Sequence, residues 1–405
     1  MLGSTFHTYV VAVIGCSSTT HTIGMPDRFF PLVVLLLLGS QLCCRDARTQ
    51  SGHLPADSNS TASSTVFADT ILPRPIEFRG VNYAHIHRRG LGYGSAASAQ
   101  ELDSLKAIGV NWTAITPFGF QQSASADQIV GFAESEPKEL DPSMETDDLK
   151  AEIEFAHQRG IHVALKPHIW SHDFWNGGQW HGTVQQPTPQ AHARWWNSYR
   201  AMTLHYANLA EGSRADLFCI GTELVKMTTT YPEEWRTLIA DVRKVYHGPL
   251  TYAAHWEREF DSIPFWDALE YIGITAYFPL NVPDTATVGQ LAEAWGPHLE
   301  RIGRLAKATN RPVLFMEIGY RPATGIFREP WRYDGGTLDY GAQQRAYEAM
   351  FRAATARPWF KGLFLWKAFT APDRAARHGE DIGFTFRRTP AEAVVKKWFL
   401  GSSNK

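Results

Sequence analysis

Two glutamates stand where apolar runs of the chain end, and together they suggest paired acid–base chemistry. The run Leu217–Thr222 leads to Glu223, and the run Val313–Met316 leads to Glu317. A carboxylate at the end of an apolar strand costs desolvation energy unless it is paired or hydrogen-bonded, so a single one is often a structural ion-pair partner. Two of them match what cleavage of a glycosidic bond requires: one carboxyl protonates the leaving oxygen while the other attacks or stabilises the anomeric carbon. Their surroundings must then separate the two pKa values.

The elements that must position these glutamates alternate between short apolar strands and amphipathic helices. We expect strands at Ile76–Ala84, Gly109–Pro117, His162–Ile169, Asp216–Glu223, Leu250–His255, Tyr271–Tyr277, Pro312–Ile318 and Lys361–Trp366. We expect helices at 96–108, 146–159, 190–211, 232–246, 261–269, 288–309, 340–356 and 390–399. Eight strand–helix units in roughly 330 residues are typical of an α/β fold with a single (β/α)8 TIM barrel. A doubly wound sheet is the rival, but no glycine-rich phosphate loop follows the first strand.

Barrel enzymes carry their chemistry at the C-terminal ends of the strands, which is where both glutamates lie. The fourth and seventh strands face each other across the rim of the barrel, so a sugar would fit between the two carboxyls. Side chains alternate in direction along a strand. If Glu317 points inward, Phe315 and Val313 are expected to fill the barrel beneath it. The same alternation places Gly221 and Cys219 beneath Glu223, where small residues would leave room.

Further binding candidates are aromatic and polar residues at other strand ends. Trp366 ends the eighth strand, where an indole offers a flat surface to the apolar face of a sugar. Tyr277 ends the sixth strand, where its phenol would orient Glu317 through a hydrogen bond. His168 lies at the end of the third predicted strand, Trp256 follows the fifth, and Trp170 opens a loop rich in tryptophan and glycine. For each of these residues, plain packing is the structural alternative.

Composition narrows the classes of partner and cofactor. The chain has 405 residues and a net charge of −2, which argues against a nucleic-acid partner. Cys16, Cys43 and Cys44 precede the barrel, so Cys219 is expected to be a small buried core residue without a disulfide. The histidines near the third strand lack the clustering of a metal site. We therefore expect no metal and no cofactor, and a polysaccharide or oligosaccharide as the partner.

The first part of the chain is expected to lie outside the fold. Residues 1–44 are predicted to be a leader or signal segment, with 1–24 an extension upstream of the true start at Met25. The apolar run 29–38 is too short to span a bilayer, which needs about 20 apolar residues, and it follows a basic residue as in a signal peptide. Cys43 and Cys44 are candidates for a lipid anchor. Residues 45–70 are rich in Ser and Thr and are expected to form a flexible linker, and 71–402 form the barrel.

This organisation predicts an exported protein that is periplasmic, anchored by lipid at the cell surface, or secreted.

Several short segments resemble clan A of the glycoside hydrolases and, within it, glycoside hydrolase family 113, whose known members are β-1,4-mannanases. These segments are Gly80–Tyr83, Lys166–His168, Ile220–Leu224, Thr275–Pro279, Met316–Tyr320 and Leu363–Trp366. The resemblance covers about residues 76–400. It implies a retaining mechanism in which Glu223 is the acid/base and Glu317 the nucleophile. It also adds Asn82 and Lys166 to the binding candidates.

One position departs from the wider clan. Many members have asparagine before the acid/base, where it holds the sugar 2-hydroxyl, and this chain has Thr222. Thr222 is therefore expected to bind substrate less directly. The leading hypothesis is a retaining β-glycoside hydrolase acting on a mannan-type substrate. A non-catalytic carbohydrate-binding barrel and a transglycosylase using the same glutamates remain alternatives, and the sugar, endo or exo action and oligomeric state stay open.

Overall fold

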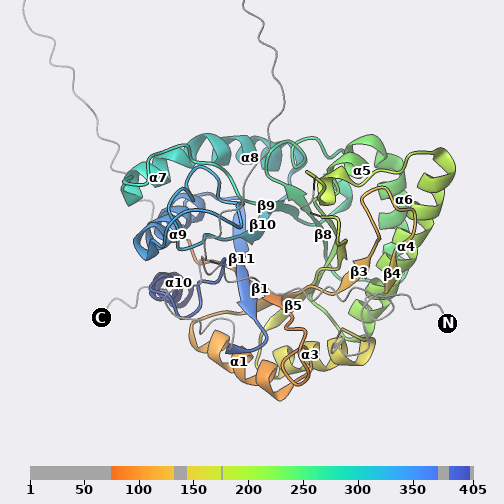
Figure 1. The fold of residues 1–405 in the computed structure, drawn as a ribbon, viewed down its shortest axis with the longest axis horizontal. Coiled ribbons are helices and arrows are strands. Elements are labelled where there is room, and N and C mark those ends of the chain that lie inside the picture. Colours follow the sequence, from red (N-terminus) through yellow and green to blue (C-terminus); the bar gives the residue numbers. More distant parts are fainter. Residues whose placement is uncertain (1–73, 132–143, 175–176, 373–382, 402–405) are drawn as a thin grey trace, which may run out of the picture. The chain divides into compact units, whose positions relative to one another are not determined.

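The computed structural model describes residues 74–131, 144–174, 177–372 and 383–401, and eight of their strands close into a parallel barrel (Figure 1). In order around the barrel the strands are β1 (Phe78–Ala84), β2 (Trp112–Ile115), β5 (His162–Leu165), β7 (Leu217–Thr222), β8 (Leu250–His255), β9 (Ile272–Thr275), β10 (Val313–Ile318) and β11 (Phe360–Phe369). The predicted (β/α)8 barrel is confirmed. The predicted leader and linker lie outside the described residues.

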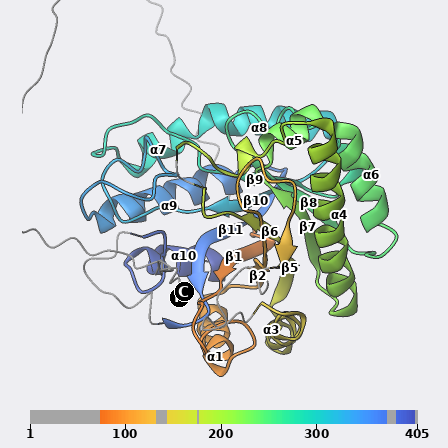
Figure 2. The same cartoon turned by 45° about the vertical axis from the view of Figure 1, so that its right-hand side comes forward.

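Helices surround the strands in both ribbon views (Figures 1 and 2). They are α1 (Ala96–Ala107), α3 (Thr146–Gln158), α4 (Pro189–Gly212), α5 (Val225–Thr230), α6 (Pro232–Val242), α7 (Val288–Ala294), α8 (Gly296–Thr309), α9 (Tyr340–Thr355) and α10 (Ala391–Leu400). Local chemistry sets where they begin. The Thr188 side chain caps α4 by accepting from the Ala191 amide, and Pro189 occupies the first turn, where its missing N–H costs nothing. Asp339 caps α9 in the same way.

Prolines explain two differences from the predicted elements. The strand expected at 162–169 breaks at Pro167: β5 ends at Leu165, and β6 (His168–Trp170) instead joins β3 (Phe118–Phe120) and β4 (Val130–Gly131) in a separate three-stranded sheet. Pro167 has no N–H to continue the barrel ladder. The helix predicted at 261–269 is wrong apart from the 3-10 turn Trp266–Ala268, because Pro264 interrupts it.

The barrel interior shows that the predicted alternation on β10 was wrong. Leu314 and Met316 pack inside the barrel, whereas Phe315 packs outward and stacks on Trp295 at 6.0 Å between ring centroids. The register between β10 and β9 shifts between Phe315 and Glu317. Such a bulge inserts one residue and re-aims the side chains beyond it.

A similar shift lies on β7, between Cys219 and Thr222. Cys219 is inside the barrel as predicted, but Gly221 faces the helices, because a Cβ there would lie 2.6 Å from the Tyr199 hydroxyl. Both glutamates thus follow strand segments whose pairing is irregular.

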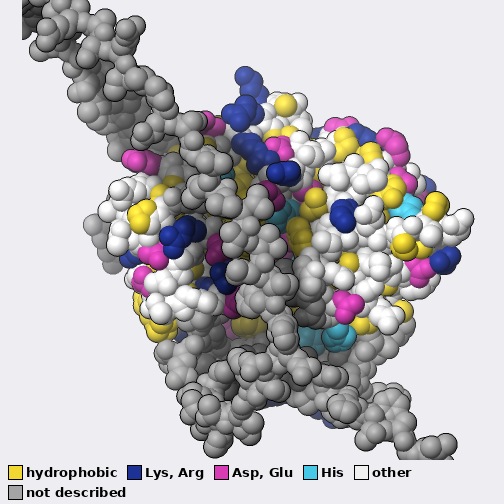
Figure 3. All heavy atoms as spheres, turned by 45° about the horizontal axis from the view of Figure 1, so that its top comes forward, with side chains coloured by type: hydrophobic (Ala, Val, Ile, Leu, Met, Phe, Trp, Pro, Cys, Tyr) yellow, Lys and Arg dark blue, Asp and Glu magenta, His cyan; other side chains and the backbone are white. Residues whose placement is uncertain are grey.

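Acidic and basic side chains are interspersed over the described part of the surface drawn in Figure 3. Within the described ranges, no helix has the length and apolarity needed to cross a membrane.

Candidate active site

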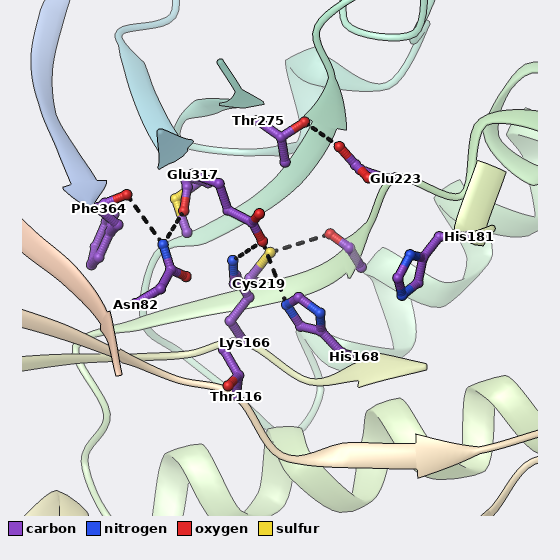
Figure 4. A network of polar contacts seen from close by, with 12 residues as sticks. Asn82, Thr116, Lys166, His168, His181, Cys219, Glu223, Thr275, Glu317 and Phe364 are labelled. Atoms are coloured by element: carbon purple, nitrogen blue, oxygen red, sulfur yellow. Dashed lines mark hydrogen bonds and ion pairs between the residues drawn. The ribbon is translucent and has the colours of Figure 1, made fainter. Parts of the chain in front are cut away.

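Glu317 is buried at the end of β10 and forms an ion pair with Lys166. The Lys166 Nζ lies 2.6 Å from Glu317 Oε1, and the lysine side chain is completely buried. The Tyr277 hydroxyl, from the segment after β9, donates to Glu317 Oε2 at 3.4 Å. Figure 4 shows the Lys166 and His168 side chains converging on this carboxylate. This charge-assisted hydrogen bond holds the Glu317 carboxylate in a fixed orientation.

Glu223 is half-buried at the end of β7, in a different environment. Its nearest polar partner is neutral: the Thr275 hydroxyl donates to Glu223 Oε1 across from β9 (Figure 4). Burial, then the negative charge of Glu317, raises the pKa of Glu223 to about 8. Because its pKa is about 8, this carboxyl carries its proton near neutral pH. The backbone of Glu223 has φ +52°, a left-handed conformation that a residue with a side chain rarely adopts.

Together the two glutamates offer one ion-paired carboxylate and one protonated carboxyl on facing parts of the same rim. This combination suits a reaction that needs a nucleophile or charge stabiliser on one side of a bond and a proton donor on the other. The structure thus brings together the two residues that the sequence singled out.

His168 and Trp366, two of the predicted binding residues, lie beside this pair. His168 Nε2 is 3.8 Å from Glu317 Oε1 and has no hydrogen-bond partner among the described residues. Burial, then the nearby charge of Lys166, lowers the pKa of His168, so the ring is neutral. The half-buried Trp366 ring lies nearly parallel to the His168 ring, at 6.5 Å and 17°. These groups leave a flat indole and a ring nitrogen available to a bound molecule.

Asn82 and Thr222 are buried under the site. Asn82 Nδ2 donates to the carbonyls of Met316 and Phe364 at 2.9 and 3.1 Å, so it ties β1 to β10 and β11. Asn82 Oδ1 and Thr222 Oγ1 have no hydrogen-bond partner within the described chain. Lys166, predicted to bind substrate, is instead buried and engaged with Glu317. Asn82 and Lys166 thus hold the site in shape.

The other two predicted binding residues lie on its margin. Trp170 is half-buried on β6, and its ring meets Phe118 edge-on at 6.1 Å. Trp256 is half-buried just after β8 and stacks on Trp331 at 5.0 Å and 21°. Trp331 is 39% exposed, so the pair presents an aromatic surface to solvent.

Sequence reasoning missed three residues of the site. Thr275 stands two positions before Tyr277 in the predicted strand Tyr271–Tyr277, so the alternation of strand side chains offered a signal for it. Trp331 and Tyr333 belong to the loop between β10 and α9. Tyr333 packs edge-on against Phe384 at 5.0 Å, and Phe384 also meets Tyr277. Trp331 and Tyr333 could not be recognised from the sequence, because exposed aromatic residues in a loop follow no periodic pattern.

The residues that the structure describes contain no cluster of three or more histidine, cysteine or acidic side chains that would hold a metal ion. Cys219 is a free, buried cysteine.

Comparison with known proteins connects this site to a family. A model described as Glycoside Hydrolase Family 113 matches residues 81–399. The GH113 β-mannanase AaManA from Alicyclobacillus acidocaldarius, solved in complex with ManMIm, is 28% identical, with a TM-score of 0.68 over 81% of this chain and 98% of that one. Another GH113 β-1,4-mannanase is 26% identical, with a TM-score of 0.67 over 80% and 99% of the two chains.

More distant structures share the fold alone. A β-glucuronidase from Ruminococcus gnavus is 15% identical, with a TM-score of 0.55 over 81% of this chain and 50% of that one. A search of curated proteins finds no match. Because the family model spans the barrel from β1 to α10, the chain belongs to glycoside hydrolase family 113, in clan A, and is a glycoside hydrolase.

Proposed function

We propose that this protein is a retaining β-glycoside hydrolase that cleaves β-1,4-linked mannan or its oligosaccharides. The observation that carries the mechanism is the contrast between the two carboxyls: Glu317 is ion-paired with Lys166, and the pKa of Glu223 is raised to about 8. The mannan substrate is supported by the β-mannanases among the most similar solved structures.

In the first step, a Glu317 oxygen attacks the anomeric carbon and forms a covalent ester with the sugar. The bond to the glycosidic oxygen breaks, and that oxygen takes the proton of Glu223, so the leaving chain departs as a neutral alcohol. The Tyr277 hydroxyl and the Lys166 ammonium hold Glu317 during the attack.

In the second step, Glu223 acts as a base. It has given up its proton, and it removes one from a water molecule that attacks the same carbon from the side the leaving chain vacated. The ester to Glu317 breaks, Glu317 returns to its charged form beside Lys166, and Glu223 is protonated again. Two inversions give a product with the starting β configuration.

The mechanism is tested by the configuration of the first product. With mannooligosaccharides, NMR at early times should show the β anomer before mutarotation, and an initial α anomer would overturn the retaining assignment. Replacing each glutamate with alanine and adding azide separates their roles. Glu223→Ala should give a β-glycosyl azide from an activated substrate, and Glu317→Ala an α-glycosyl azide.

A matched control is Glu300→Gln, on the exposed face of α8, which should keep wild-type rates. If Glu223→Gln and Glu317→Gln also keep wild-type rates on every substrate, the catalytic assignment is wrong. Binding of mannan without turnover by the wild type would instead indicate a carbohydrate-binding barrel. Products longer than the substrate would indicate transglycosylation.

We also propose that the protein is exported, on the basis of the apolar run 29–38 and the Ser- and Thr-rich residues that follow. Expression of the full chain, fractionation and N-terminal sequencing would test this. An intact N-terminus in the cytoplasmic fraction would refute it.

A further inference from the structure

Another buried glutamate, Glu259, lies in the loop after β8 and takes no direct part in the proposed bond cleavage. It is completely buried. Its Oε1 accepts hydrogen bonds from the hydroxyls of Tyr252 and Thr228, both at 2.7 Å, and its Oε2 accepts from the His255 amide at 2.7 Å. Tyr252 and His255 belong to β8 and Thr228 belongs to α5, so this carboxyl fixes the strand and the helix relative to one another.

Two of these donors lead directly to the acid/base candidate. The Tyr252 hydroxyl accepts a hydrogen bond from the amide of Leu224, the residue after Glu223, at 2.6 Å. Thr228 lies on α5, the short helix that begins at Val225. Glu259 therefore anchors the chain on the C-terminal side of Glu223 at two points.

The backbone at Glu223 needs such support. Its left-handed φ of +52° is unfavourable for a residue with a side chain and persists only where surrounding contacts over-determine it. The Glu223 amide donates to the Ala253 carbonyl of β8 at 2.9 Å, which fixes the chain from the other side. The bonds through Tyr252 and Thr228 complete this support.

Packing keeps Tyr252 in place. A Cβ on Gly221 would lie 2.9 Å from a ring carbon of Tyr252, so the glycine two residues before Glu223 allows the close approach of the ring. The Tyr252 ring meets Trp235 edge-on at 5.2 Å.

We propose that Glu259 is a positioning residue for the general acid: through Tyr252 and Thr228 it fixes the backbone that carries Glu223 and aims its carboxyl at the glycosidic oxygen. This inference rests on the proposed function, because it assigns Glu259 a role in the protonation of the leaving group.

The charge of Glu259 also favours the protonated form of Glu223. After burial and Glu317, the charge of Glu259 also raises the pKa of Glu223, while Lys166 and the Thr275 hydrogen bond lower it. Around Glu259 itself stand Tyr252, Thr228 and the amide of His255, and burial raises the pKa of Glu259 to about 7. In its ionised form Glu259 helps Glu223 to keep its proton.

The test compares a substrate whose leaving group must be protonated with one whose leaving group departs without a proton. In Glu259→Gln, kcat/KM for mannotetraose should fall about tenfold, part of the 10²–10⁴-fold that a general acid contributes. For 2,4-dinitrophenyl β-mannoside, whose leaving group departs without a proton, kcat/KM should stay within about twofold of wild type. The alkaline limb of the kcat/KM profile for mannotetraose should move to lower pH.

Glu152→Gln is the matched control. Glu152 is also completely buried, accepts from the Gly94 amide and the Ser98 hydroxyl, and has a pKa that burial raises to about 7. It should change neither the leaving-group dependence nor the alkaline limb. If Glu259→Gln does not fold, Tyr252→Phe takes its place, with the same selective loss on mannotetraose expected.

Equal effects on both substrates, or none on either, in a folded variant would overturn the positioning role while leaving the proposed function intact. Failure of the proposed function would look different, because the wild type itself would then cleave neither substrate.

Discussion

Replacing Glu223 with glutamine should make the protein more stable above neutral pH while abolishing the proposed activity on mannan. Glutamine keeps the size of the side chain and an oxygen that accepts from Thr275. What it removes is a half-buried carboxyl whose pKa is raised from its ordinary value of 4.5 to about 8, by burial first and then by Glu317.

The sign follows from proton binding. Between pH 4.5 and about 8 the folded state holds a proton on Glu223 that the unfolded state has lost, so the free energy of unfolding falls as the pH rises through this window. A fully expressed change of this size would amount to roughly 5 kcal/mol, at about 1.36 kcal/mol per pH unit. Solvent screening of a half-buried group lowers the expected difference to about 2–3 kcal/mol.

Urea unfolding of wild type, Glu223→Gln and Glu300→Gln at several pH values measures this difference. The free energies of wild type and Glu223→Gln should agree most closely near pH 4 and diverge steadily up to pH 8, with the variant more stable. Glu300→Gln should follow the wild type throughout. A constant offset at every pH, or a variant that loses stability as the pH rises, would refute the raised pKa and with it the protonated acid at neutral pH.

Three further substitutions test other parts of the site. Lys166→Met should cost about 3–5 kcal/mol of stability, because it leaves the buried Glu317 without its cation, and should also lower kcat; urea unfolding and kinetics would detect both. Trp331→Ala removes an exposed ring stacked on Trp256, so KM for long mannooligosaccharides should rise several-fold, a loss of about 1 kcal/mol, with unfolding unchanged. Gly221→Ala should cost about 1–3 kcal/mol in a thermal or urea melt and lower activity, because its Cβ would displace the rings that support Glu223.

The sequence was sufficient to predict the barrel and the position of the two glutamates at the ends of its strands, since apolar runs and the residues that end them are local features. It failed at the bulges. Side chains alternate strictly only where strand pairing is regular. Glu317 and Phe315 would then share a face, but the register shift between them lets Phe315 pack outside the barrel. A bulge of one residue cannot be recognised within an apolar run of the sequence, because its position depends on how two strands pair.

The conformation of the loop between β10 and α9 could not be predicted from the sequence either, because it also depends on contacts between distant residues. Its shape depends on tertiary bonds, such as those from Arg321 Nη2 to the carbonyls of Asp334 and Gly335 at 2.7 and 3.0 Å. These bonds hold the segment that carries Trp331 and Tyr333. No periodic pattern predicts them, so the aromatic residues of this loop could be recognised only in the structure.

The roles proposed for the two glutamates follow from the groups beside each carboxyl more than from how deeply each carboxyl is buried. Both carboxyls are withdrawn from solvent, and Glu317 is the more buried of the two. Only Glu317 has an ammonium group at 2.6 Å, and Lys166 reaches it from the point where Pro167 ends β5. The Glu223 carboxyl accepts a hydrogen bond from the neutral Thr275 hydroxyl and is repelled by the negative charge of Glu317. The negative charge of Glu317 raises the pKa of Glu223, so the second carboxyl keeps its proton, as the proposed role of acid requires.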